Sequence, residues 1–251
     1  MNVQRQGWLV RSWGWLQSKK KGARSVKYAI LLLSLSTLTW SGAYWGGGEF
    51  QASRGIDWED LNVLIVILTG VLAVSRDRKL RWITFILAGG TLGISWWSEL
   101  AESRSLFILS DAGFALFFAY VAGIIIYDLG KTDGVTVDTI IGAVCAYLII
   151  GAVFGFLYSL TELLIPGSFS ASSPTGAEYS PLRHRDYANL IYYSFVTLSS
   201  VGFGDIVPVS RMARLLTWTE SVFGQFYMAI LVARLVALQL SSRRKMTSAT
   251  E

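Results

Sequence analysis

Long runs of apolar residues alternate with short polar segments along this chain of 251 residues. A helix needs about 20 predominantly apolar residues to cross the hydrocarbon core of a bilayer. Six runs come close to that length or exceed it, at residues 28–45, 58–74, 80–97, 106–127, 137–165 and 215–240. The pattern predicts an all-α membrane protein with six transmembrane helices, and a loop at 197–208 falls between the last two.

Composition and charge agree with a membrane protein. The chain is 53% hydrophobic, contains ten Trp residues and has a mean hydropathy of +0.46, which argues against a soluble enzyme. The net charge of +5 does not indicate a nucleic-acid partner, because the Lys and Arg residues border the apolar runs. Fifteen of them fall on one side of the predicted membrane and six on the other. Since cytoplasmic loops carry the excess, we predict a multi-pass protein of the cell membrane with both termini cytoplasmic.

The same pattern divides the chain into four regions. Residues 1–27 interleave Trp and Leu with basic residues, which indicates an amphipathic segment on anionic lipids and not a cleavable signal peptide. A loose basic tail that only fixes the topology is the alternative. Residues 28–128 form a predicted four-helix domain, 129–240 hold the last two runs with the loop between them, and 241–251 are a short cytoplasmic tail.

The loop between the last two runs contains the sequence SVGFGD at residues 200–205. Turning successive backbone carbonyls toward one axis requires residues near left-handed conformations to alternate with ordinary ones. Glycines at 202 and 204 adopt left-handed conformations at little steric cost. Four copies of such a loop would stack rings of carbonyl oxygens that replace the water shell of a cation.

This fragment resembles the TVGYGD selectivity filter of the tetrameric potassium channels. The resemblance implies a fourfold-symmetric homotetramer with a re-entrant pore helix and filter, which conducts K+ passively and needs no cofactor. The K+-binding positions correspond to Ser200, Val201, Gly202 and Phe203, and Gly204 completes the filter. Ser200 stands where threonine is usual and Phe203 where tyrosine is usual, so one buried phenolic hydrogen bond of the family is absent.

Residues on either side of the filter are expected to support it. Asp186 is suited to cap a short pore helix that ends near Leu198, and the C-terminal dipole of that helix favours a cation. Tyr192 and Tyr193 fall where the family often has paired tryptophans. Asp205 follows Tyr192 by thirteen residues, which is the family's spacing for a hydrogen bond that braces the filter.

The sixth run is similar to the inner pore helix of these channels. Gly224 comes twenty residues after Gly204, where many members have a hinge glycine. The following residues form a helical stripe that resembles the lining of the cavity and gate: Gln225, Met228, Ala229, Val232 and Val236. The resemblance implies that a hydrophobic lower pore closes by dewetting. On the fifth run, Gly151 and Gly155 have a small-residue spacing that suits packing of the outer helix against the inner one, or general helix packing.

Four ionisable residues are candidates for modulating the pore. Asp111, near the outer end of the fourth run, is either a functional group at membrane depth or solvated at the outer interface. His184 is expected near the external mouth, either titrating near neutrality or as a spectator. Glu220 either pairs with pore-helix hydroxyls or faces the outer interface, and Arg234 either reaches inner headgroups or forms a gating salt bridge.

The fourth run, where a voltage sensor places basic residues, contains no Lys or Arg, so strong voltage gating is not expected. Two other transport functions remain open. One is a less selective Na+/K+ channel of the same architecture. The other is a subunit of a potassium transporter, although such proteins carry four diverged pore loops in one chain. No span contains paired catalytic carboxylates, a Ser/His pair or metal-ligand spacing, which argues against an enzyme.

Overall fold

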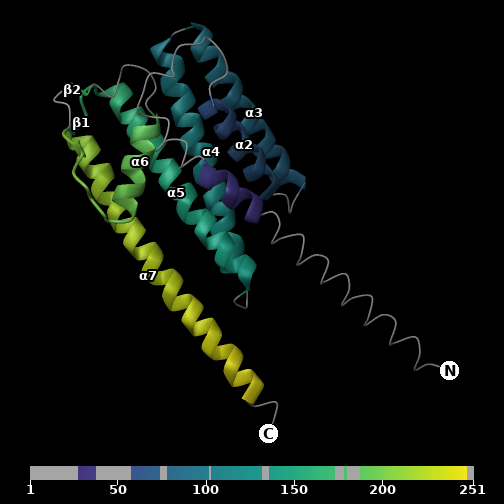
Figure 1. Cartoon of the computed structure of the whole chain (residues 1–251). Helices are drawn as coiled ribbons and strands as arrows, with labels where there is room; N and C mark the ends of the chain where they lie inside the picture. Colours follow the sequence, from purple (N-terminus) through teal and green to yellow (C-terminus); the bar gives the residue numbers. More distant parts are fainter. Residues whose placement is uncertain are drawn as a thin grey trace.

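The computed structural model is a bundle of long helices with a small sheet at one end (Figure 1). It describes residues 28–37, 58–73, 78–101, 103–131, 136–172, 178–179 and 187–247. The described helices are Tyr28–Thr37, α2 (Trp58–Ala73), α3 (Arg78–Ala101), α4 (Arg104–Gly130), α5 (Val137–Leu164), α6 (Tyr187–Leu198) and α7 (Arg211–Thr247). Each of the six apolar runs therefore contains a helix, and α6 occupies the segment of the predicted pore helix.

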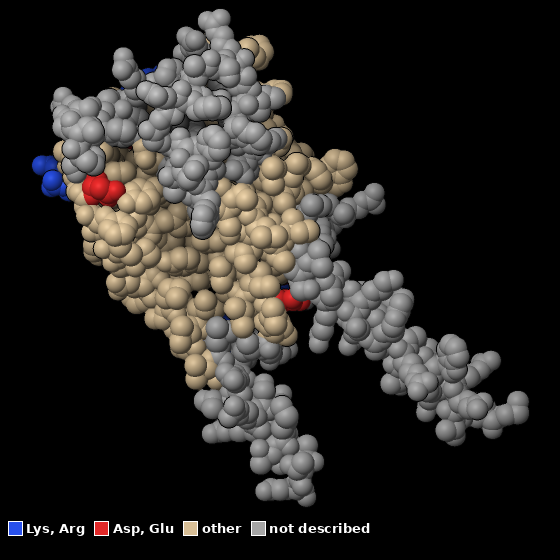
Figure 2. Space-filling model, in the orientation of Figure 1, with Lys and Arg blue, Asp and Glu red and all other residues tan. Residues whose placement is uncertain are grey.

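Three of these helices are long and apolar enough to cross a membrane by length and composition. They are α4, α5 and the Arg211–Arg234 part of α7. Figure 2 shows a broad face of the bundle that is free of Lys, Arg, Asp and Glu among the described residues, with charged atoms near its two ends. The protein is therefore an integral membrane protein, while the full number of six spans stays a prediction.

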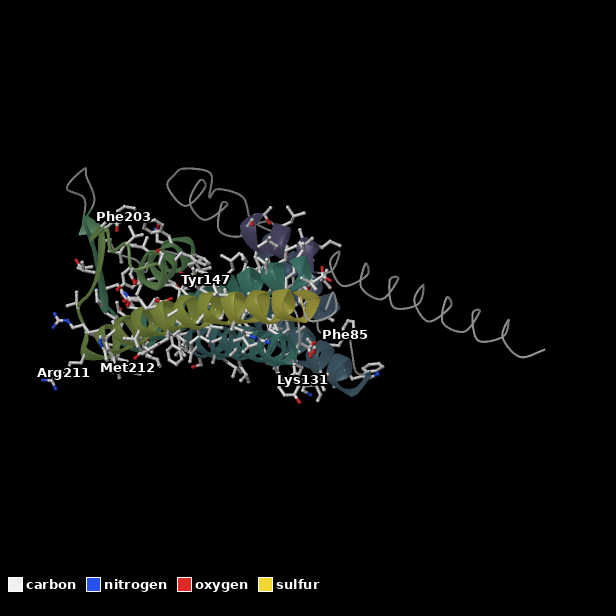
Figure 3. The ribbon with its side chains drawn as sticks, turned by 90° about the horizontal axis from the view of Figure 1, so that it is seen from below. Phe85, Lys131, Tyr147, Phe203, Arg211 and Met212 are labelled. Atoms are coloured by element: carbon white, nitrogen blue, oxygen red, sulfur yellow. The ribbon has the colours of Figure 1, made fainter. Side chains whose placement is uncertain are left out.

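The two ends of the bundle carry different parts of the predicted pore. Residues 200–205, the predicted filter, are called the filter segment here. Its Phe203 lies at the same end as Arg211, at the start of α7 (Figure 3). Lys131, directly after α4, lies toward the other end (Figure 3). The filter segment and the C-terminal end of α4 thus lie toward opposite ends of the bundle, which agrees with the predicted topology.

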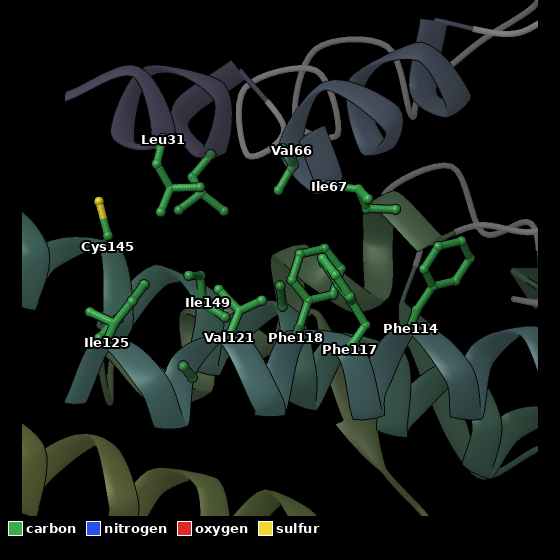
Figure 4. Close-up of a cluster of buried hydrophobic side chains, with 14 of the residues drawn as sticks. Leu31, Val66, Ile67, Phe114, Phe117, Phe118, Val121, Ile125, Cys145 and Ile149 are labelled. Carbon is green, nitrogen blue, oxygen red and sulfur yellow. The ribbon is translucent and has the colours of Figure 1, made fainter. Parts of the chain in front are cut away.

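The main hydrophobic core joins the first helices to α5 (Figure 4). Phe156 of α5 stacks on Phe114 and Phe118 of α4, with ring centroids 5.0 and 5.6 Å apart. Such aromatic pairs contribute roughly 0.5–1.5 kcal/mol beyond their buried area. The predicted boundary at 128/129 stays a prediction, but the helices on its two sides share one core.

A small three-stranded antiparallel sheet accompanies the helices, and the chain is otherwise helical, as the expected all-α membrane fold requires. Its strands are β1 (Phe169–Ser172), β2 (Glu178–Tyr179) and β3 (Ile206–Pro208), in the order β2-β1-β3. Strand β3 directly follows the filter segment, and Ala171 of β1 pairs with Ile206 of β3. The exit of the filter segment is therefore held by backbone hydrogen bonds to the loop that follows α5.

Candidate functional site

The candidate site is the segment between α6 and β3, and its position depends on how α6 packs. Helix α6 lies against α5 where two glycines leave room for it. A Cβ on Gly155 would come within 2.8 Å of Ile191, and one on Gly151 within 2.6 Å of the Phe195 ring. These glycines therefore admit the predicted pore helix, which corrects the expectation that they pack the outer helix against the inner one.

The backbone of the segment alternates in handedness. Ser200, Gly202 and Gly204 have φ angles of 58°, 60° and 78°, all in the left-handed region. Two of these positions are the glycines that were expected to have this conformation. Ser200 also adopts it, although the left-handed conformation costs an L-residue about 1–2 kcal/mol. At the start of the segment, the N–H groups of Val201 and Gly202 both donate to the carbonyl of Val196, at 3.0 and 3.4 Å. These two N–H groups are therefore turned back toward α6.

The predicted hydrogen bond behind the segment is present. The Tyr192 hydroxyl donates to the Asp205 carboxylate over 2.8 Å, and the other oxygen of Asp205 accepts the N–H of Ile206 at 3.0 Å. Asp205, at the outer end of the segment, is thereby tied to both α6 and β3. Tyr193 points elsewhere, because its hydroxyl lies 2.9 Å from Thr217 on α7 and its ring packs against Tyr158.

The loop before α6 adds a support that the sequence did not reveal. Glu162, in the last turn of α5, is only 2% exposed. Its carboxylate accepts the N–H groups of Gly167 and Phe169, at 2.7 and 3.1 Å. The Ser168 carbonyl between them accepts the N–H of Val209, just beyond β3, at 2.7 Å. Glu162 thus organises the turn on which the outer end of the filter segment rests.

Helix α7 brings a polar group to the inner end of the segment. The Gln225 amide donates to the Ser200 hydroxyl over 3.3 Å, which agrees with its predicted place below the filter. The remaining members of the predicted stripe are exposed in the single chain: Met228, Ala229, Val232 and Val236. Gly224 is buried, and a Cβ there would collide with the Leu198 carbonyl at the end of α6. Gly224 is therefore required for close packing of α6 on α7, and its expected role as a hinge stays a prediction.

Comparison with known proteins identifies the part of the chain that holds this site. A profile of the ion channel family matches residues 142–239. The voltage-gated potassium channel Kch of Escherichia coli (strain K12) is 38% identical over 74 residues, which are 30% of this chain and 17% of the relative. Residues 142–239 are thus similar to the pore-forming region of ion channels. This matched region, called the pore domain below, contains most of α5 and all of α6, which correspond to the predicted outer helix and pore helix, and the part of α7 that corresponds to the predicted inner helix.

The ionisable candidates around the pore domain have definite partners. Asp111 is fully buried and accepts the Ser159 hydroxyl of α5 at 2.7 Å, so solvation at the outer interface is wrong. Arg234 donates to the Leu129 carbonyl at the end of α4, and its expected reach to inner headgroups stays a prediction. Glu220 is fully buried and contacts the Ser194 hydroxyl of α6. This agrees with the predicted pairing with pore-helix hydroxyls and not with exposure at the outer interface.

Some predicted residues fall outside the described part of the chain. His184 and the capping residue Asp186 precede α6 and are among them, as are residues 1–27 with their expected lipid contacts. Within the described residues, no group of three or more His, Cys, Asp or Glu side chains is placed to hold a metal ion.

Proposed function

We propose that four copies of this chain form a passive, K+-selective channel in the cell membrane, with both termini in the cytoplasm. The observation that carries the proposal is the alternation of left-handed residues at 200, 202 and 204 directly after a buried helix. In a fourfold ring, this backbone supplies stacked carbonyl oxygens to a dehydrated cation. Ser200, Val201, Gly202 and Phe203 provide the K+ sites, and no further cofactor is needed.

The exposed apolar surface of α7 supports assembly of several copies. In the single chain, only 11% of the most apolar stretch of α7 is buried. The corresponding share is 50% in α4 and 56% in α5. The inner-helix stripe of α7 is exposed together with the filter segment, where Phe203 is 69% exposed. A single loop supplies a quarter of each oxygen ring, and closed symmetric rings are the usual form of homo-oligomers. Four chains therefore cover α7 and complete the pore.

We expect the channel to open without steep voltage dependence. One elementary charge moved through 100 mV yields only about 2.3 kcal/mol, so voltage sensors use three or four basic residues per subunit. Helix α4 contains no Lys or Arg after Arg104 at its first position. Its Asp111 is held by Ser159. Recordings of the purified protein in planar bilayers, in symmetrical K+, should give a K+ current that changes only weakly with voltage. A sigmoid conductance curve that requires several gating charges would contradict this expectation.

Tyr192→Phe is expected to make the K+ current decline faster during sustained opening. The substitution keeps the ring and removes the hydroxyl that holds Asp205. Hydrogen bonds to charged groups contribute about 1.5–3 kcal/mol, so the filter loses a sizeable brace. Tyr120→Phe is the matched control, because the Tyr120 hydroxyl is buried without a hydrogen-bond partner among the described residues. Equal decay of the current in both variants would count against a bracing role for Tyr192.

A further inference from the structure

A fully buried carboxyl group joins the three helices of the pore domain behind the filter. Glu220 of α7 is 0% exposed. One of its oxygens accepts the Tyr158 hydroxyl of α5, and the other meets the Ser194 hydroxyl of α6. Ser194 lies one helical turn before Leu198, the last residue of the pore helix. The Glu220 carboxyl is thus placed to fix the position of α6 relative to both neighbouring helices.

The surroundings of Glu220 favour a neutral carboxyl. Its hydrogen-bond partners are hydroxyls and not cations. Among the described residues, the other titratable groups that interact with it are Tyr147 on α5 and Tyr193 on α6. Burying a carboxylate without a cation costs several kcal/mol, and such a group takes up a proton instead.

The hydrogen bonds around Ser194 lead to the same conclusion. Its hydroxyl has one proton and lies 2.7 Å from the backbone carbonyl of Gly151, which only accepts. If the Ser194 proton serves that bond, the contact with Glu220 needs a proton from the Glu220 carboxyl. The Tyr158 hydroxyl supplies the proton for the second oxygen. Every partner is then satisfied, whereas an ionised Glu220 would have to compete with Gly151 for the Ser194 proton.

We infer that Glu220 is held protonated and is a positioning residue of the pore, a neutral clamp that keeps α6 seated between α5 and α7. The inference deepens the proposed channel function and rests on it for its effect on K+ flux. Ionisation of Glu220 would release Ser194 from Gly151 and loosen the helix that carries the filter. The clamp therefore depends on the proton and not on the negative charge.

The test compares Glu220→Gln with Glu220→Ala in purified, reconstituted protein. The amide of Gln matches the neutral acid, because its N–H donates to Ser194 and its oxygen accepts from Tyr158. We expect Glu220→Gln to retain K+ flux and resistance to heat, and Glu220→Ala to lose both. In the infrared difference between wild type and Glu220→Gln at neutral pH, we expect a carboxylic acid C=O band that shifts in D2O. The buried Asp111 and Glu162 are present in both proteins, so their bands cancel.

Each result decides the inference. Absence of the acid band, or loss of flux in Glu220→Gln as complete as in Glu220→Ala, overturns it. If Glu220→Ala does not assemble, the comparison of Glu220→Gln with wild type decides alone. If the wild type itself carries no K+, the proposed channel function fails. The infrared band and the heat resistance of the Gln variant still test the protonated clamp in that case.

Discussion

Gly202→Ala is expected to abolish selective K+ current while the protein still folds and inserts in the membrane. Gly202 has a φ of 60°, and nothing lies within 4 Å of the place where a Cβ would be built in the single chain. The penalty is therefore one of backbone conformation. A left-handed L-residue costs about 1–2 kcal/mol, so a ring of four copies would lose roughly 4–8 kcal/mol from the conducting conformation. Since each 1.4 kcal/mol is a factor of ten, we expect the current to fall by about a thousandfold or more.

Gly89→Ala is the control for this prediction. Gly89 lies in α3, and a Cβ there also meets nothing within 4 Å. Its backbone is helical, so alanine is tolerated and the K+ current should be unchanged. The readout is K+ current in planar bilayers from equal amounts of reconstituted protein. If Gly202→Ala conducts K+ with wild-type selectivity, the filter assignment fails.

Gly224→Ala is expected to destabilise the assembled protein and to remove its K+ current. A Cβ at this position would collide with the carbonyl of Leu198, and that carbonyl cannot move without moving the start of the filter segment. Overpacking of this kind costs about 1–3 kcal/mol per site. The expected result is a lower unfolding temperature of the detergent-solubilised protein, together with loss of current.

Gly123→Ala in α4 is the matched control for Gly224→Ala, because a Cβ there meets nothing within 4 Å. The two roles of Gly224 predict different outcomes. A close-packing role lowers both heat stability and current, whereas a role limited to hinge bending would change opening and leave the heat stability at the wild-type value. Wild-type stability with altered opening would therefore overturn the packing account.

The helices and the core of the site were predictable because each depends on local sequence. Apolar runs of membrane length predicted the helices, and α4, α5 and α7 agree with them to within a few residues at their N-terminal ends. The glycines at 202 and 204 predicted left-handed backbone, since glycine alone adopts it without strain. The thirteen-residue spacing predicted the hydrogen bond between Tyr192 and Asp205, which is present.

What the sequence did not predict depends on contacts between distant segments. Ser200 adopts a left-handed φ that its own side chain does not favour, and its position is constrained by bonds to α6 and α7. The strands β1 and β3 are too short to show a periodic pattern, and they pair across more than thirty residues. The burial of Asp111 and the contact of Arg234 with Leu129 depend on which neighbour each helix faces. A helical pattern gives the face of a helix but not its partner.

The reversal potential of the purified protein in a planar bilayer tests the central claim most directly. One side contains ten times more K+ than the other, and Na+ replaces K+ to keep the ionic strength equal. A K+-selective pore is expected to reverse close to the K+ equilibrium potential, about 59 mV from zero for this gradient. A reversal potential near zero, with the same current carried by Na+, would contradict the account and favour a non-selective cation channel.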